Sequence, residues 1–301
     1  MNRRTLVLAI AIPLVLAALE PNKTETVHYS YQMQSGSRLT VENMNGSIEI
    51  SGWDQNMIDI TATKHAETDQ MLAQLKVDVA VAADGVHIRT IAPSEAHNVG
   101  VKYVLKVPRR TELAEIRSSN GSIRVTETDG AANLRTSNGS VNASKTRGKL
   151  EIGTSNGSVQ IQENDGETDV QTSNGSVHAS GIRGPLKAAT SNGGMHVDLE
   201  ESRGGPVTLT TSNGGVDLKL GSATQSAVKA ETSNGGITLR MPASAGAHVR
   251  AVTSSHSKVS SDFDVRKEGA NSESHLEGVV GAGGPTVELT TSQGSIRLLK
   301  L

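Results

Sequence analysis

The sequence predicts an all-β protein that forms a parallel β-solenoid with two short strands in each coil. Three observations support this fold class: a Ser-Asn-Gly triplet recurs at an almost constant interval, apolar and polar residues alternate between the triplets, and the aromatic residues of the 301-residue chain are only one Trp, three Tyr and one Phe. A solenoid stacks each coil on an equivalent one and therefore favours a constant repeat length. Because each coil buries a narrow strip, small aliphatic residues can fill the interior without large rings.

The repeat has a period of about 18 residues, which lengthens to about 21 residues towards its end and suits one short solenoid coil. A second Gly-containing turn lies midway, and the residues before its glycine, Asp129, Arg147, Asp165 and Arg183, alternate in charge as neighbours in one column would favour. Stacking at a strand spacing of about 4.8 Å would align the Asn residues, and the Thr two positions before each, into hydrogen-bonded ladders. The predicted structural ladder comprises Asn120, Asn138, Asn156, Asn174, Asn192, Asn213 and Asn234.

Apolar residues occupy every second position on both sides of each triplet. Leu150 and Ile152 precede one triplet, and Val159 and Ile161 follow it. A period of two indicates strands with one buried face. Asn-Gly is also the strongest short hairpin signal, so an antiparallel β-meander is the alternative path. A meander needs no constant unit length, and the fixed period therefore favours the parallel solenoid.

The first element in the chain, residues 1–18, is expected to be a signal peptide. Arg3 and Arg4 precede an apolar run from Leu6 to Leu19, which is shorter than the roughly 20 residues of a transmembrane helix and typical of a signal-peptide core. A retained anchor is the alternative. Since no second long apolar run follows, we expect an exported mature chain without a stable transmembrane segment, located in the periplasm, at the cell surface or outside the cell. The chain has no Cys, so it would fold without disulfides.

The rest of the chain divides into three parts. Residues 19–110 alternate less regularly and are interpreted as N-terminal irregular β coils that cap one end, with a short helix at 67–76. Residues 111–255 carry the regular Ser-Asn-Gly repeats. Residues 256–301 begin with a polar, Gly-rich stretch, interpreted as a long loop, and end with a closing coil, at 287–298, that finishes the stack.

Several further motifs accompany the repeat. Asn45-Gly46-Ser47-Ile48 is an early copy, Ser51-Gly52-Trp53-Asp54 follows it, Val107-Pro108 precedes the first full repeat, and a copy with Gln in place of Asn closes the chain at 283–296. With these motifs, nearly all of the mature chain resembles the bacterial adhesin-like or "toastrack" β-repeat family. The resemblance implies a right-handed β-helix-like domain in the cell envelope. Some members accompany envelope-stress signalling systems. The resemblance brings no catalytic or ligand residues to this chain.

One column of the predicted solenoid could bind a metal ion. The position four residues after the triplet Asn holds His178, His196 and Asp217 in three consecutive coils. Two imidazoles and a carboxylate are suitable zinc or copper ligands. The alternative interpretation is a solvated face that carries two His by chance.

The sequence offers no convincing active site. Parallel β-helices can process polysaccharides, which requires convergent carboxylates or a carboxylate with a charged partner. Asp198, Glu200 and Glu201 are adjacent acids, but no aromatic platform for a sugar lies between Tyr103 and Phe263. A polysaccharide-active enzyme is therefore the weakest functional alternative, and we predict no catalytic residues and no cofactor.

The preferred interpretation is a non-enzymatic, adhesin-like scaffold or binding protein of the envelope or cell surface. Its partner would be a surface glycan or an unknown envelope protein. The alternative is a sensory or assembly module of an envelope-stress signalling system that binds another envelope protein. The formal net charge of −2 gives no basic surface, so nucleic acid is not an expected partner.

Overall fold

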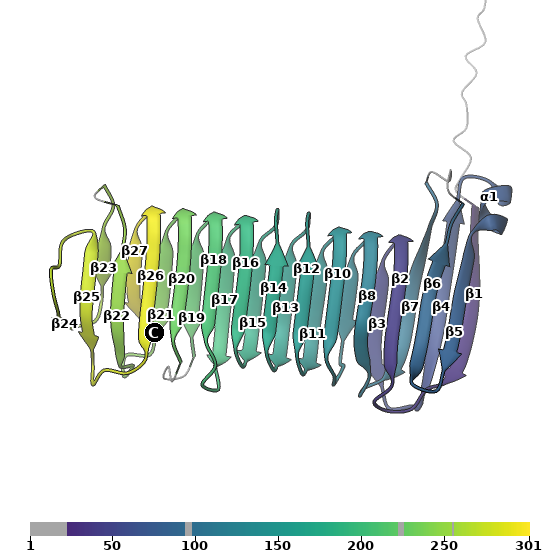
Figure 1. The fold of residues 1–301 in the computed structure, drawn as a ribbon, viewed down its shortest axis with the longest axis horizontal. Helices are drawn as coiled ribbons and strands as arrows, with labels where there is room; N and C mark the ends of the chain where they lie inside the picture. The colour runs from purple at the N-terminus through teal and green to yellow at the C-terminus, as the bar shows by residue number, and fades with distance from the viewer. Residues whose placement is uncertain (1–22, 94–97, 222–225, 255) are drawn as a thin grey trace, which may run out of the picture.

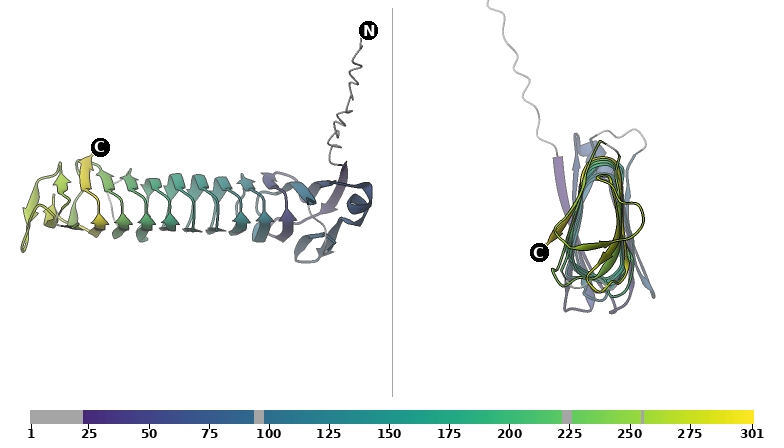
Figure 2. Two further views of the ribbon diagram at one scale, coloured as in Figure 1. Left: turned by 90° about the horizontal axis from the view of Figure 1, so that it is seen from above. Right: turned by 90° about the vertical axis from the view of Figure 1, so that its left-hand side faces the viewer.

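Two long, facing β-sheets form the protein (Figure 1). The computed structural model describes residues 23–93, 98–221, 226–254 and 256–301, so the predicted signal peptide lies outside the described residues. Within these ranges there are 27 strands and one short helix. Sheet I has 14 strands and sheet II has 13. Seen along the long axis, the two sheets enclose a flattened, narrow interior (Figure 2).

Each regular coil contributes one strand to each sheet, and the Ser-Asn-Gly triplet forms the turn between them. In sheet I these strands are β8 (Glu112–Asn120), β10 (Ala132–Asn138), β12 (Leu150–Thr154), β14 (Thr168–Thr172), β16 (Leu186–Asn192), β18 (Val207–Asn213) and β20 (Val228–Asn234). In sheet II they are β9 (Ile123–Thr126), β11 (Val141–Arg147), β13 (Val159–Asp165), β15 (Val177–Arg183), β17 (Met195–Glu201), β19 (Val216–Leu220) and β21 (Ile237–Met241).

Neighbouring coils pair in parallel, with equivalent positions side by side. Val141 pairs with Val159, and Val159 pairs with Val177. The strands before and after each triplet lie in different sheets, so they do not form a hairpin. The prediction of a parallel solenoid with two strands per coil is confirmed, and the antiparallel meander is wrong.

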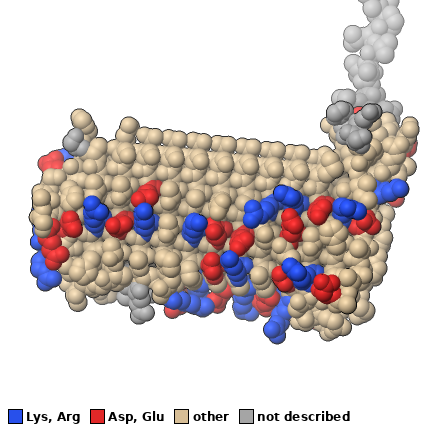
Figure 3. All heavy atoms as spheres, in the orientation of Figure 1, with Lys and Arg blue, Asp and Glu red and all other residues tan. Residues whose placement is uncertain are grey.

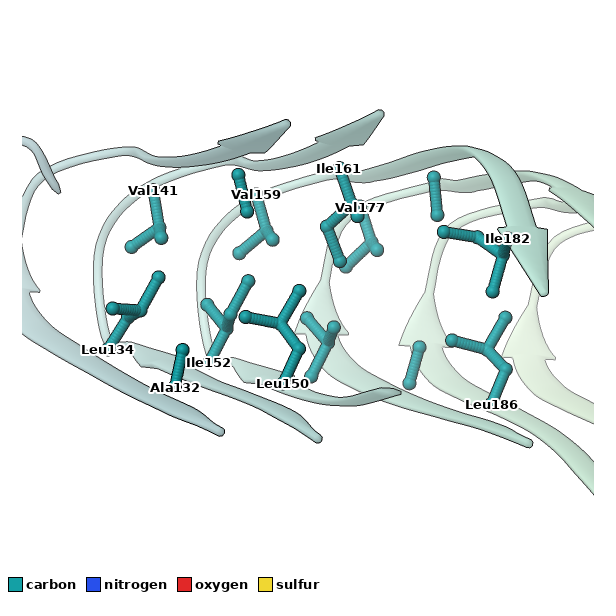
Figure 4. Close-up of a cluster of buried hydrophobic side chains, with 14 of the residues drawn as sticks. Ala132, Leu134, Val141, Leu150, Ile152, Val159, Ile161, Val177, Ile182 and Leu186 are labelled. Carbon is teal, nitrogen blue, oxygen red and sulfur yellow. The ribbon is translucent and has the colours of Figure 1, made fainter. Parts of the chain in front are cut away.

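The core is a continuous strip of aliphatic side chains between the sheets. Leu134, Leu150 and Ile152 of sheet I point towards Val141 and Val159 of sheet II, and all five are nearly inaccessible to solvent (Figure 4). No aromatic residue lies in the regular coils, since none occurs between residues 103 and 263. The low aromatic content therefore reflects the small space between the sheets.

The N-terminal end is a coil capped by antiparallel strands. β2 (Arg38–Asn45) and β3 (Ile48–Trp53) stack directly on β8 and β9, and β6 (Gly85–Ile91) and β7 (Gly100–Pro108) form the next coil outwards. Antiparallel strands then cover both sheets. They are β4 (Met57–Ala66) and β1 (Lys23–Gln32) on sheet II and β5 (Lys76–Ala82) on sheet I, and they are accompanied by helix α1 (Asp69–Gln74).

This end corrects one prediction and supports another. The irregular region does not form only coils, because three of its strands run antiparallel to their neighbours. The helix expected at 67–76 is present as α1, whose first turn is capped by the Thr68 hydroxyl. Among the described residues, no helix is long and apolar enough to cross a membrane.

The C-terminal end differs from the sequence-based prediction. β26 (Thr286–Gln293) and β27 (Ile296–Lys300) do not finish the stack but lie between β20/β21 and an outer coil, β22 (Ala247–Val252) and β23 (Val259–Ser261). The stretch expected as a long loop contains β23 and two antiparallel capping strands. These are β24 (Val265–Lys267) and β25 (His275–Val280).

The hydrogen bonds of the repeat explain this insertion. Thr291 bonds to the carbonyl of Gly235 below it, and the carbonyl of Gly294 accepts from Thr253 above it. The last repeat copy therefore forms the Thr–Gly bond of the regular coils with the coil on each side of it. The outer coil that contains Thr253 forms this bond on one side only, and on its other side β22 pairs with the antiparallel strand β25.

Candidate functional site

The edge of sheet I that carries the triplets is an ordered array of polar side chains. Along it, each Asn Nδ2 donates to the Oδ1 of the Asn in the preceding coil at 2.8–2.9 Å. The column begins one coil earlier than the predicted ladder because Asn120 donates to Asn45. Each Asn thus fixes the orientation of the next, and the edge is held in one register. The bonded residues are Asn45, Asn120, Asn138, Asn156, Asn174, Asn192, Asn213 and Asn234.

The Thr column forms a different bond from the one predicted. The side chains point into the interior and donate to the backbone carbonyl of the turn glycine in the neighbouring coil, at 2.7–3.1 Å, rather than to one another. A buried hydroxyl needs a partner, and the turn carbonyl provides one. The donors are Thr136, Thr154, Thr172, Thr190, Thr211, Thr232, Thr253 and Thr291.

The Ser column between Thr and Asn faces solvent. Ser137, Ser155, Ser173 and Ser191 are exposed, and none has a side-chain hydrogen bond to another described residue. The array therefore has three columns. The inner Thr column and the Asn column at the edge form hydrogen bonds within the protein, and the Ser hydroxyls between them form none with the described residues.

A groove of about 440 Å³ runs beside this Ser row across the outer face of sheet I. It spans β8, β10, β12, β14 and β16. Its floor is formed by the column of residues that precedes the Thr column, in which Ser118 takes the place of Thr; these residues are Arg117, Arg135, Gly153, Gln171 and Ala189. On this face the charged side chains form a band across the middle, and an uncharged strip separates much of the band from the edge (Figure 3). We call this feature the sheet I groove.

The opposite turns form an ionic surface. Arg147 pairs with Asp129 at 3.4 Å, as the predicted charge alternation requires, but Asp165 pairs with Arg203 and Arg183 pairs with Glu200. The Asp165 carboxylate raises the pKa of Arg203. A cavity of about 670 Å³ lies among these residues, and its charges neutralise one another across neighbouring coils.

The predicted metal ligands lie on three adjacent strands of sheet II. His178 pairs with His196, and His196 pairs with Asp217. The two imidazole rings are 6.3 Å apart, and His196 Nδ1 lies 3.6 Å from an Asp217 oxygen. Arg240 also forms an ion pair with Asp217. In the part of the chain that the structure describes, no group of three or more His, Asp or Glu is placed to hold a metal ion. The zinc or copper site stays a prediction, and it would require the Arg240 side chain to move.

The three adjacent acids do not converge on one point. Asp198 binds Lys219 at 2.7 Å and Glu200 binds Arg183 at 2.7 Å. Glu201 lies near Arg203 at 3.9 Å. Each acid is thus part of a separate ion pair on the surface.

Comparison with known proteins places the chain in a family. No curated protein matches it. Among solved structures, a candidate adhesin from Bacteroides fragilis is 12% identical with a TM-score of 0.43, covering 92% of this chain and 97% of that one. A candidate cell adhesion protein from Clostridium sporogenes is 12% identical with a TM-score of 0.23, covering 92% and 100%. The family model for Toastrack DUF4097 matches residues 37–299. The chain therefore belongs to the Toastrack DUF4097 family.

Proposed function

We propose that this protein is a non-enzymatic binding scaffold that is exported and acts at the cell envelope or cell surface. The observation that carries the proposal is the exposed polar array on sheet I, in which equivalent side chains repeat from coil to coil in one fixed register. An array of this kind can contact an extended ligand at many points. The basic and apolar N-terminal sequence supports export.

The array is rigid, which favours binding. The same two coils are connected by a backbone ladder, an Asn–Asn bond and a Thr–Gly bond, as between β8 and β10. A surface that is ordered before binding loses little conformational entropy when it meets a ligand. Weak contacts at successive coils then add to one another because the first contact raises the effective concentration for the next.

The distribution of charge supports a binding role rather than catalysis. The acids that a polysaccharide-processing enzyme would need, Asp198 and Glu200, are each neutralised by a different basic residue. General acid–base catalysis needs two such groups facing one substrate bond. The geometry of these acids is that of surface ion pairs.

The second candidate, a sensory or assembly module, is favoured by the N-terminal end. β1, Lys23–Gln32, pairs with β4 on one side and is the outermost described strand of sheet II. It contains two Thr, two Tyr and one Val, residue types that favour strands. Such an edge can accept a strand from a partner protein.

A pull-down from envelope extract separates the two functions. The purified chain, immobilised through its C-terminus, is incubated with untreated extract and with extract digested by protease. Retention of glycan or of whole cells from both samples supports the scaffold. Capture of one stoichiometric protein, lost after digestion, would contradict the scaffold and support the assembly module. A variant with Ser30→Lys on the exposed side of β1 is the matched control, because a charge at this edge opposes strand addition without entering the core.

A further inference from the structure

Two arginines lie side by side at one end of the sheet I groove. Arg117 on β8 and Arg135 on β10 are directly paired in the parallel register, and both are exposed. Like charges opposite each other on neighbouring strands are unfavourable. Other columns differ: Asp129 and Arg147 on neighbouring coils carry opposite charges, whereas Glu151 and Asp169 carry like charges.

The charge of this pair is only partly compensated. Arg117 lies 3.7 Å from Glu115, whereas Arg135 donates its Nε–H to the neutral side chain of Asn133 at 3.0 Å. No carboxylate of the described residues lies within ion-pair distance of Arg135. Glu151, whose pKa is lowered first by Lys149 and to a smaller extent by Arg135, is bound by Lys149 at 2.7 Å. The terminal nitrogens of Arg135 are therefore available to an anion in the groove.

The floor of the groove is low next to this pair. Gly153 follows Arg135 in the column, and a Cβ at position 153 would have two atoms of the Arg135 side chain as neighbours, Cγ at 3.8 Å and Nη1 at 3.9 Å. The backbone there is extended, so neither conformation nor space requires glycine. A missing side chain at Gly153 and a short one at Ala189 leave the groove open on both sides of Gln171.

The side of the groove offers hydroxyl and amide groups. Ser137, Ser155, Ser173 and Ser191 stand in a row with unused hydroxyls, and the Gln171 side chain lies on the floor. At about 4.8 Å between strands, the five strands of the groove extend over about 19 Å along the solenoid axis. This length and lining suit an extended polymer that carries many hydroxyl groups.

We propose that the sheet I groove binds a linear acidic polysaccharide that lies along the solenoid axis, with an acid group at Arg117 and Arg135 and sugar hydroxyls at the Ser row and Gln171. A carboxylate between two guanidinium groups forms charge-assisted, bidentate hydrogen bonds and removes the repulsion between them. The proposal rests on the proposed function as a binding scaffold and names its ligand class. Two arginines with no aromatic side chain nearby do not fit a nucleic acid strand, which needs a longer basic track and stacking surfaces.

Calorimetric titration of the purified chain tests the proposal. The probes are polygalacturonate oligomers, dextran sulfate, neutral dextran and single-stranded DNA, each at low and at moderate salt. We expect polygalacturonate to bind and neutral dextran to bind about tenfold more weakly or not at all, because charged hydrogen bonds supply much of the affinity. Stronger binding of dextran sulfate would identify sulfate rather than carboxylate as the acid group. DNA binding as tight as that of the polysaccharides would overturn the proposal.

Two variants locate the site, and two others serve as controls. Arg135→Gln removes the free cation, and Gly153→Gln fills the groove with the side chain that the same column already holds at Gln171. Each should weaken polygalacturonate binding about tenfold. Arg124→Gln makes the same charge change on sheet II, and Thr210→Gln adds the same side chain in the next coil beyond the groove. Both controls should bind within about twofold of wild type.

The outcomes separate the groove from the scaffold. Wild-type protein that binds no acidic polysaccharide, or a correctly folded Gly153→Gln protein that binds as wild type does, would overturn the groove proposal. If the groove proposal fails in either way but the wild-type protein still retains envelope glycan in the pull-down, the scaffold function stands without the groove. If wild-type protein retains no envelope material, the scaffold function itself fails.

Discussion

At the scale of single residues, two glycines of one coil have different roles. Gly157 is the turn glycine, and a Cβ built on it would lie 2.0 Å from the carbonyl oxygen of Gly139 in the coil below. Gly153, four positions earlier, has no such neighbour. The turn glycine is therefore required by the close approach of stacked coils, whereas Gly153 shapes the surface.

The two glycines allow a matched test of stability. Gly157→Ala should lower the free energy of unfolding by about 1–3 kcal/mol, because the stacked turn has to move to admit the methyl group. Gly153→Ala should change it by no more than about 0.5 kcal/mol. Urea unfolding followed by circular dichroism measures both. Equal losses in the two variants would contradict the stacking of the turns.

The Asn column makes a second prediction at this scale. Asn156 donates to Asn138 and accepts from Asn174, so Asn156→Ala removes two hydrogen bonds. We expect a loss of about 1–2 kcal/mol in the free energy of unfolding. The control is Ser155→Ala at the next residue, whose hydroxyl has no partner in the described chain, and it should stay within about 0.5 kcal/mol. An Asn156→Ala protein as stable as this control would show that the column adds nothing.

At the scale of elements, the turns opposite the triplets contain a column of strained backbone. Glu127, Lys145, Glu163 and Gly181 hold equivalent positions in four consecutive coils and have φ values of 56°, 52°, 61° and 66°. In β11 and β13 these residues stand outside the pairing register, between Ser144↔Gln162 and the next pair. A stacked bulge therefore re-aims the chain at each coil, and only one of its four members is glycine.

Replacing a strained residue of this column by glycine should stabilise the protein. Glu163→Gly should raise the free energy of unfolding by about 0.5–1 kcal/mol, because an L side chain in the left-handed region costs more than the extra freedom that glycine gives the unfolded chain. Gln162→Gly, in the extended part of the same strand, should lower it by about 0.5–1 kcal/mol. Chemical unfolding of both variants measures the two signs, and a shared sign would contradict the account.

A buried tyrosine gives the N-terminal coil a pH dependence. Burial raises the pKa of Tyr103 from 10.0 to about 12, and its hydroxyl lies 2.7 Å from that of Thr90, which donates to Asn43. The neutral form is favoured in the folded state. Its contribution to stability is therefore complete below pH 10 and is lost as the pH rises from about 10 to 12.

Unfolding curves between pH 9 and pH 12 test this dependence. Wild-type protein should lose stability over that interval more steeply than Tyr103→Phe, which has no proton to release. Tyr31→Phe, on edge strand β1, should keep the steep loss. Parallel curves for wild type and Tyr103→Phe would show that Tyr103 does not titrate in this way.

The elements also show how far sequence reasoning extends. The constant spacing of Asn120, Asn138 and Asn156 was sufficient to predict which residues stack, because in-register pairing copies each position onto its equivalent. It could not predict which coils are neighbours at the ends, where β2 and β26 reach their partners across long segments. Loops of any length can bridge such gaps at small entropic cost, so the sequence leaves the order of the end coils open.

The sequence alone does not reveal the sheet I groove, because the groove does not follow the repeat. The columns that attract notice are those that repeat, whereas the groove arises in the variable column, where Gly153 stands among long side chains. The adjacent arginines, which stand one repeat apart in the chain, were a usable signal once the register was assumed. The predicted ligands His178 and His196 do lie on adjacent strands, but which side chains pair with Asp217 depends on Arg240 in the next coil.

At the scale of the whole molecule, the end strands limit the addition of further chains to the stack of coils. A bare solenoid end exposes unpaired strand edges and invites further chains to add. Antiparallel strands cover both sheets at the N-terminal end, where they are β1, β4 and β5, and sheet I at the C-terminal end, where they are β24 and β25. Sheet II ends there in β23, which runs parallel to β27. The short β23 and β24, of three residues each, leave little edge at the C-terminal end. The longer β1 is the edge best suited to a partner.

The exposed Ser row between these caps should be straight and evenly spaced, and the proposed function depends on it. Because the chain has no native Cys, spin labels can be attached at pairs of introduced cysteines alone. The pairs Ser119→Cys with Ser191→Cys and Ser119→Cys with Ser233→Cys lie four and six strands apart in sheet I. Pulsed electron–electron double resonance should give narrow distance distributions for both pairs. The backbone positions are about 19 Å apart in the first pair and about 29 Å apart in the second, and the label linkers shift the measured centres from these values. Broad distributions, or equal distances for the two pairs, would contradict the fixed-register array.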